Sequence, residues 1–259
     1  SIAQRAGCKA TILPMIQLVQ RSILLGLALL LFNGCGTTTR RSAANKALNI
    51  LMLGGGSSHD FQKWFGDADS ATLRELPNVT ATYTEAVDTI VPQLATTDVL
   101  YLSNNNPFTQ AATRQAIMDH VNQGRGLVIV HAGMWYSWRD WPEFNRVLVG
   151  GGSRGHDRFG EFEVKVTDPA HPVMAGVPAS FRITDELYWQ EADPAGTPIK
   201  VLATAHSNLR NKTYPSIFIV EHPKARIVGI ALGHDGKAHE HPAYKQLLKN
   251  AVSWAARRP

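Results

Sequence analysis

Short runs of apolar residues that alternate with a helix-like segment restrict the fold of this chain more than any other feature. In the first half, an alternating pattern predicts a strand at 79–83, and such apolar runs predict strands at 48–53, 99–102 and 127–130. Before the last of these, residues 109–123 carry one apolar stripe and predict a helix; the stripe consists of Ala112, Ala116, Ile117 and Val121. Strands that alternate with helices indicate a parallel sheet that is covered on both faces.

The second half of the chain adds strand candidates that follow one another more closely. They lie at 162–166, 181–183, 199–203, 216–220 and 227–232. A last helix begins at Pro242, and its apolar face is expected to close the sheet; that face consists of Ala243, Leu247, Ala251 and Trp254. The predicted class is therefore α/β, with a mostly parallel sheet flanked by helices and extra strands in the second half.

The N-terminal segment has the pattern of an export signal. Residues 23–32 are an apolar run that is too short to span a membrane, which takes about 20 residues, but is typical of a secretory leader. Asn33-Gly34-Cys35 follows and resembles the bacterial lipobox, in which the cysteine carries the lipid and becomes the mature N-terminus. The alternative is a buried helix, which the polar segment after Cys35 disfavours.

These patterns divide the chain into three parts. We expect residues 1–34 to be the leader, with 1–14 an upstream extension before Met15. Residues 35–46 are expected to be a flexible tether, and 47–259 the folded domain. The mature protein would then be exported and anchored to the cell envelope, periplasmic or at the outer surface, with its N-terminal lipid as the only membrane contact.

The basic charge of the chain belongs mostly to this N-terminal region. The net charge is +5, with 26 basic and 21 acidic residues. Six of the basic residues, and none of the acidic ones, precede Ala47. The predicted domain is therefore close to neutral, and no nucleic-acid partner is expected. Both cysteines, Cys8 and Cys35, also precede Ala47, which excludes a cysteine nucleophile or a cysteine-based zinc site in the domain.

Histidines follow three of the predicted strands at the point where each strand ends. His59 and Asp60 come after the first strand, His131 after the fourth, and His234 and Asp235 after the strand at 227–232. Ligands of open α/β sheets bind at the carboxyl ends of the strands. We therefore predict that His131, His234 and Asp235 are catalytic, and that His59, His131 and His234 could hold a metal such as zinc. The alternative for each histidine is a structural hydrogen bond.

Further candidates lie beside these positions and would bind the substrate. Trp135 and Tyr136 follow His131, and the acidic pair Asp185-Glu186 precedes Tyr188; aromatic faces and carboxylates suit sugar rings and hydroxyls. The glycine run at 150–152 predicts a mobile loop that carries His156 over the pocket. The glycine run at 54–56 is interpreted as a tight turn, because its spacing does not fit a phosphate-binding motif.

Several of these segments, taken in order, resemble a known family. They are LMLGGGSSHD, LVIVHAG, DPAHPVMAGVP, ITDELYWQ and IALGHDGKAHEHPAYKQLLKNAVSWAA, and together they extend over about residues 49–256. The chain thereby resembles the ThuA-like (trehalose utilisation) domains. That resemblance implies a flavodoxin-like sheet similar to class I glutamine amidotransferases. It also implies that His59, His131, His234, Asp235, Asp185, Glu186 and Tyr188 belong to the pocket.

The same resemblance places His131 where the amidotransferases carry their cysteine nucleophile, on a sharp strand-to-helix turn. Amidotransferase chemistry is therefore not expected, since the predicted domain has no thiol. The family's link to carbohydrate use implies an enzyme, a hydrolase or lyase, that acts on a small sugar such as a trehalose-like or keto-sugar glycoside. The alternative is a sugar-binding lipoprotein without catalytic activity. Neither the sugar nor a cofactor follows from the sequence.

Overall fold

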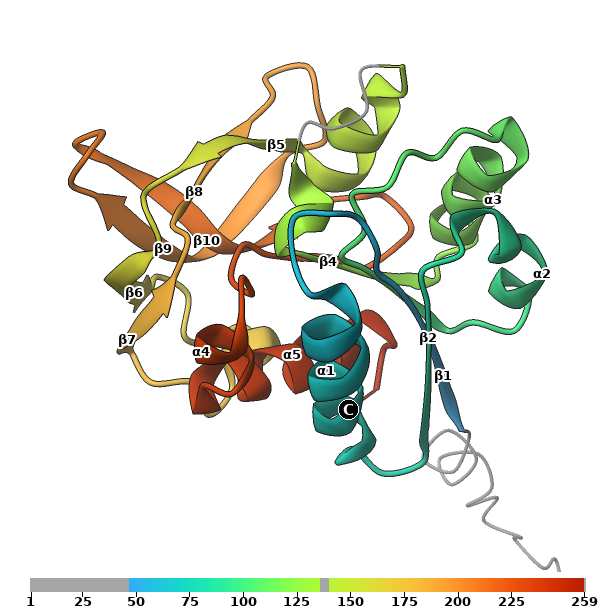
Figure 1. Cartoon of the computed structure of the whole chain (residues 1–259), viewed down its shortest axis with the longest axis horizontal. Coiled ribbons are helices and arrows are strands. Elements are labelled where there is room, and N and C mark those ends of the chain that lie inside the picture. The colour runs from blue at the N-terminus through green and yellow to red at the C-terminus, as the bar shows by residue number, and fades with distance from the viewer. Residues whose placement is uncertain (1–46, 136–139, 259) are drawn as a thin grey trace, which may run out of the picture. The chain divides into compact units, whose positions relative to one another are not determined.

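A nine-stranded sheet runs through the computed structural model, which describes residues 47–135 and 140–258 (Figure 1). These residues belong to one compact unit. The predicted leader, the tether, Cys35 and Tyr136 lie outside the described residues. Among the described residues, no helix is long and apolar enough to cross a membrane.

The strands fall into a parallel half and an antiparallel half. The spatial order is β2-β1-β3-β4-β11-β10-β9-β6-β7, and the first five strands are parallel to one another. The parallel strands are β1 (Leu48–Leu53), β2 (Val79–Thr84), β3 (Val99–Leu102), β4 (Gly126–Val130) and β11 (Ile227–Ile230). Each remaining strand is antiparallel to its neighbour. These are β10 (Lys212–Val220), β9 (Ile199–Ser207), β6 (Gly160–Val166) and β7 (Ser180–Asp185). The predicted α/β class and the extra strands of the second half are confirmed.

Two apolar layers cover the two faces of the sheet, because successive side chains of a strand point to opposite faces. Met52 packs in the layer with α1 (Asp69–Arg74) and α5 (Pro242–Ala255). Leu51 packs in the other layer with α2 (Val91–Leu94) and α3 (Ala111–Asn122). Strands β1, β3 and β4 are buried on both faces, which explains why these three runs are almost wholly apolar. The predicted helices at 109–123 and from Pro242 correspond to α3 and α5.

The remaining helical segments are short. They are η2 (Gln62–Ala68) and η5 (Phe144–Val149), which are π-helical, the 3-10 turns η3 (Val87–Thr89), η4 (His131–Met134) and η6 (Pro172–Met174), and α4 (Gly236–His239). Segment η2 begins shortly after the loop at the end of β1. It continues directly into α1, so one helical stretch covers residues 62–74.

The predicted mobile loop at the glycine run 150–152 is wrong. Residues Gly151–His156 form strand β5, which pairs with β8 (Tyr188–Ala192) in a separate two-stranded sheet. The absence of a side chain at these glycines allows the backbone to lie close to neighbouring atoms, and does not make the segment mobile. Gly151 has a φ of 150°, and a Cβ there would lie 1.9 Å from the Glu191 carbonyl oxygen. His156 is therefore the last residue of a strand.

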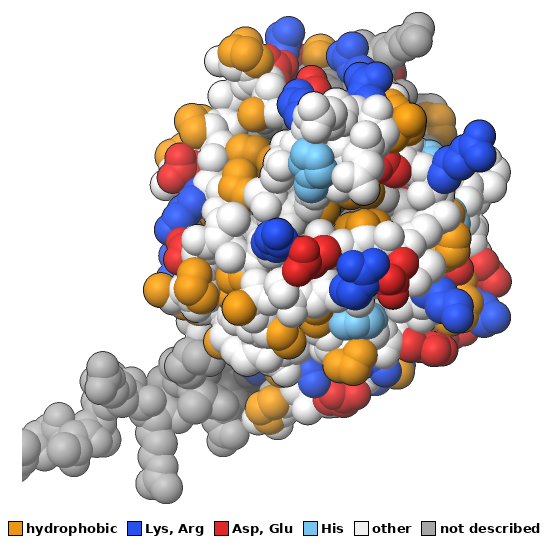
Figure 2. Space-filling model, turned by 90° about the vertical axis from the view of Figure 1, so that its left-hand side faces the viewer, with side chains coloured by type: hydrophobic (Ala, Val, Ile, Leu, Met, Phe, Trp, Pro, Cys, Tyr) orange, Lys and Arg blue, Asp and Glu red, His pale blue; other side chains and the backbone are white. Residues whose placement is uncertain are grey.

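The surface over β6–β10 carries acidic and basic side chains side by side (Figure 2). Salt bridges join such neighbours, as between Lys212 and Glu191 and between Arg182 and Glu161. This mixture agrees with the near-neutral charge of residues 47–259.

Candidate functional site

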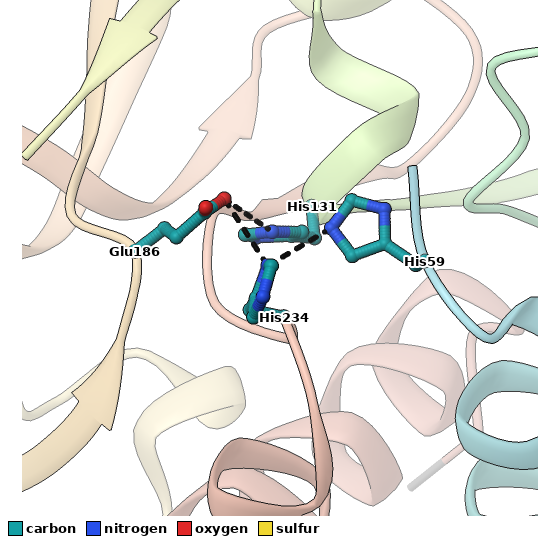
Figure 3. A group of neighbouring side chains, drawn as sticks. All are labelled: His59, His131, Glu186 and His234. Atoms are coloured by element: carbon teal, nitrogen blue, oxygen red, sulfur yellow. Dashed lines mark hydrogen bonds and ion pairs between the residues drawn. The ribbon is translucent and has the colours of Figure 1, made fainter. Parts of the chain in front are cut away.

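Four side chains converge at the carboxyl edge of the parallel strands. They are His59, His131, Glu186 and His234, and one nitrogen or oxygen atom from each lies within 4.8 Å of those of the others (Figure 3). His59 follows β1, His131 follows β4 and His234 follows β11. Because these strands are parallel, their carboxyl ends meet at one edge of the sheet. Glu186 reaches the same point from the connection between β7 and β8.

His131 occupies a strained turn between β4 and the helical turn η4. Its φ is 43°, in the left-handed region that non-glycine residues seldom adopt and that costs roughly 1–3 kcal/mol. The turn is tight, because a Cβ on Gly133 would lie 2.4 Å from the carbonyl oxygen of Leu102. Such sharp strand-to-helix turns present a side chain at the top of an α/β sheet. The predicted position of His131 on a turn of this kind is confirmed.

The imidazole of His131 is held from two sides and fully buried. Its Nδ1 lies 2.8 Å from the carbonyl oxygen of Ala231, and because a carbonyl can only accept, Nδ1 carries the proton. The ring stacks on Tyr188 with a centroid distance of 4.1 Å. Nε2 has no hydrogen-bond partner among the described residues and faces Glu186, with Oε2 at 3.6 Å. The side chain therefore presents a fixed, unpaired nitrogen to the cluster.

His59 and His234 contact each other directly. His59 Nε2 lies 3.1 Å from His234 Nδ1. On the far side of the ring, His59 Nδ1 is 2.6 Å from the hydroxyl of Ser58, which accepts a hydrogen bond of 2.7 Å from the Asn105 amide. Ser58 and Asn105 thus orient His59. Neither residue could be predicted from the sequence, because serine and asparagine are common in loops.

Glu186 is the acidic member of the cluster and contacts three histidines. Its Oε2 lies 3.2 Å from His234 Nδ1, and its Oε1 lies 3.5 Å from His156 Nδ1. Burial alone would raise the pKa of Glu186, but the neighbouring imidazoles of His131 and His234 outweigh burial and hold this pKa well below its usual range. In turn, the hydrogen bond to Glu186 raises the pKa of His234. Burial and the neighbouring histidines lower the pKa of His59 to about 3.

Asp185, the other member of the acidic pair, acts on the backbone. Its carboxylate is fully buried and accepts hydrogen bonds from the amides of Gly233 at 2.7 Å, His234 at 3.0 Å and Glu186 at 2.7 Å. Burial raises the pKa of Asp185, although these amides and His131 oppose that shift. Asp185 therefore ties the loop that carries His234 to the segment that carries Glu186.

A cavity of about 310 Å³ opens beside the cluster. Its lining consists of Ser58, His59, Asn105, Ala132, Trp135, His156, Glu186, Tyr188 and His234. The ring of Trp135 packs edge-on against Tyr188 at 5.5 Å. Polar nitrogens and oxygens thus surround one end of the cavity, and two aromatic rings form a wall.

Two predicted acids do not belong to the cluster. Asp60 accepts a hydrogen bond from the amide of Lys63, and Asp235 caps α4 by accepting from the amide of Lys237 at 2.8 Å. Short acidic side chains before a helix are bound by the free amides of its first turn, so they turn away from the preceding histidine. The carboxylate placed among the histidines is therefore Glu186 and not Asp235.

Two further histidines are buried partners of other groups. His120 is 2% exposed and its Nε2 donates to the carbonyl oxygen of Gly126 at 3.0 Å. His239 contacts the buried carboxylate of Asp69, and its other nitrogen donates to the carbonyl oxygen of Gly233. No local pattern identifies the Asp69–His239 contact, since the two residues are 170 positions apart.

A family model described as trehalose utilisation (ThuA) matches residues 30–255. The chain belongs to the ThuA family. The family assignment makes this a trehalose-utilisation-related protein, and no curated protein matches the chain.

Solved structures share the fold of this ThuA chain. A putative ThuA-like protein from Parabacteroides merdae superposes with a TM-score of 0.72 at 24% identity, covering 82% of this chain and 90% of its own. One from Bacteroides uniformis gives 0.69 at 19% identity, covering 82% and 92%. A putative GMP synthase protein from Thermoplasma acidophilum gives 0.51 at 13% identity, covering 82% and 95%. The fold is therefore that of the ThuA-like and amidotransferase-like proteins.

Proposed function

We propose that this ThuA domain is an enzyme, a hydrolase or lyase, that breaks the glycosidic bond of a small sugar such as a trehalose-like or keto-sugar glycoside. The observation that carries the proposal is the convergence of His59, His131, His234 and Glu186 beside an aromatic-walled cavity. Strained, buried and charged groups gathered in a cleft are typical of active sites. The family's association with trehalose utilisation supports the substrate class.

The size and lining of the cavity favour one sugar ring next to the cluster. Small-molecule sites measure roughly 300–1,000 Å³, and this cavity of about 310 Å³ is at the lower end. Trp135 and Tyr188 offer apolar faces for the C–H side of a ring. Ser58 and Asn105 offer hydrogen-bonding groups for hydroxyls. The second part of a disaccharide would extend out of the cavity.

His156 is the group that we assign to proton transfer. In hydrolysis the anomeric C–O bond breaks, water adds to the anomeric carbon and the leaving oxygen takes up a proton. In elimination from a keto sugar, the carbon next to the carbonyl loses a proton and the leaving oxygen gains one. His156 Nδ1 carries a proton, because it lies 2.8 Å from the carbonyl oxygen of Asp157. When the other nitrogen also carries a proton, it donates that proton to the leaving oxygen at the partly exposed edge of the cavity, and it regains one from the attacking water in hydrolysis or from the carbon in elimination.

Activity measurements on disaccharides and their keto derivatives test this proposal. We expect turnover by the unchanged protein, and in His156→Gln a kcat lowered by ~10²-fold or more with a smaller change in KM. His206→Gln is the matched control, because His206 is exposed on β9 and its Nδ1 lies at hydrogen-bond distance from Thr213. Calorimetric binding of these sugars without turnover would instead support a sugar-binding protein. Full activity of His156→Gln would contradict the proposed role. The absence of both sugar binding and turnover in the unchanged protein would also contradict it.

A further inference from the structure

We propose that His59, His131, His234 and Glu186 bind one divalent transition-metal ion, with zinc as the reference ion. The ligand atoms would be His59 Nε2, His131 Nε2, His234 Nδ1 and Glu186 Oε2. The ion deepens the proposed function, because it would provide a Lewis acid beside the sugar. The inference itself depends on the geometry of the four side chains and not on the identity of the substrate.

The spacing of the ligand atoms already approaches that of a tetrahedral site. His59 Nε2 and His234 Nδ1 are 3.1 Å apart, and His234 Nδ1 is 3.2 Å from Glu186 Oε2. His131 Nε2 is 3.6 Å from the same oxygen. Ligands about 2.0–2.1 Å from a tetrahedral zinc ion are ~3.4 Å from one another. All four residues supply atoms within 4.8 Å of one another, so small side-chain shifts would complete the site.

The unpaired Nε2 of His131 is the observation that most favours an ion. Because Nδ1–H is bonded to Ala231, neutral His131 presents a lone pair at Nε2, directed at a carboxylate oxygen of Glu186. A cation between these two electron-rich atoms would be bound by both of them. The separation of 3.6 Å between Nε2 and Oε2 is too long for a hydrogen bond and leaves room for an ion that contacts both atoms.

The surrounding contacts are those that orient metal ligands. Histidines that bind metals commonly donate their second ring nitrogen to a carbonyl or a polar group, which fixes the ring and its tautomer. His131 has this contact with Ala231, and His59 contacts the Ser58 hydroxyl, which Asn105 holds in place. Imidazole and carboxylate ligands without thiolates suit zinc and other first-row divalent ions.

Metal binding by the full chain, measured without reference to activity, tests the inference. The protein is stripped with a chelator and titrated with Zn²⁺ by calorimetry and with Co²⁺ by visible absorption. We expect one ion per chain, a Co²⁺ absorption band of a four- or five-coordinate site and a raised Tm. Glu186→Gln and His234→Gln should weaken binding by more than ~100-fold, and Ser58→Ala by ~10–100-fold, as for the loss of an orienting contact. His206→Gln should bind as the unchanged protein does.

Other results would overturn the metal site. The metal site would be refuted if the unchanged protein bound no stoichiometric ion. It would also be refuted if Glu186→Gln and His206→Gln bound the ion with equal affinity. Near-UV circular dichroism of each stripped variant shows whether it has folded, and Ser58→Ala tests the site through a loop side chain outside the sheet core.

Sugar turnover that persists after complete removal of the metal would refute a catalytic ion and leave the proposed function standing. Metal binding without turnover would support the site and contradict the enzyme.

Discussion

Removal of the buried carboxylate of Asp69 should destabilise this domain more than most single substitutions. Asp69 is fully buried and accepts three hydrogen bonds from distant parts of the chain. They come from the Tyr101 hydroxyl at 2.5 Å, the Tyr244 hydroxyl at 2.9 Å and His239 Nδ1 at 2.7 Å. These contacts join α1 to β3, α4 and α5. His239 also donates to Gly233, the residue before His234, so the network reaches the candidate site.

The expected loss of stability follows from the buried groups that Asp69→Ala leaves without their partner. A buried ion pair that loses one partner typically costs about 3–5 kcal/mol, because the remaining charge stays buried and uncompensated. Two tyrosine hydroxyls also lose their acceptor, which adds to the cost without full additivity. We expect about 4 kcal/mol, a large share of the ~5–15 kcal/mol that stabilises a typical domain. Asp69→Asn keeps an acceptor oxygen but not the charge, and should cost about 2 kcal/mol.

The same network predicts a pH dependence with a definite sign. Burial would lower the pKa of His239, but Asp69 outweighs burial and raises this pKa. A histidine with a raised pKa in the folded state contributes stability that is fully present below its unfolded pKa of about 6.5. That contribution is lost as the pH rises through the folded pKa. It should be absent in Asp69→Asn, since the amide does not favour a charged His239.

Urea denaturation at several pH values between 6 and 9 measures both effects. Asp67→Ala is the matched control, because Asp67 lies in the same helical stretch, is exposed and accepts a hydrogen bond from Gln62; it should change stability by less than ~0.5 kcal/mol. If Asp69→Ala proved no more destabilising than Asp67→Ala, the reasoning from buried charge would be refuted. An unchanged pH dependence in Asp69→Asn would refute the assignment of a charged His239.

Two further predictions concern other parts of the chain. Burial lowers the pKa of His120 to about 4, so the free energy of unfolding should fall by about 3 kcal/mol as the pH falls from 6.5 to 4. Urea denaturation of His120→Gln should show a smaller fall over the same range, and an equal fall would contradict this. Cys35→Ser should abolish incorporation of radiolabelled fatty acid and release the exported protein from the membrane fraction, whereas unaltered labelling would exclude Cys35 as the lipidated residue.

Much of the parallel half of the fold could be predicted from local sequence. Strands β1 and β3 correspond to the predicted runs at 48–53 and 99–102, because a strand buried on both faces requires consecutive apolar residues. Strands β5 and β8 were not predicted. Gly151–His156 has no apolar pattern, and its pairing with Tyr188–Ala192 depends on contacts far apart in the sequence.

The histidines of the site could be predicted for the same reason as the parallel strands. His59, His131 and His234 each follow such a strand, and parallel strands bring their carboxyl ends to one edge. The sequence by itself therefore determined which imidazoles meet. Only the tertiary structure decided which acid joins them: it brings the connection between β7 and β8 over this edge and inserts Glu186, while Asp235 is bound by the free amides of α4. The physical reason is that strand ends are set by local patterns, whereas the partner of a charged side chain is set by distant elements that compete for it.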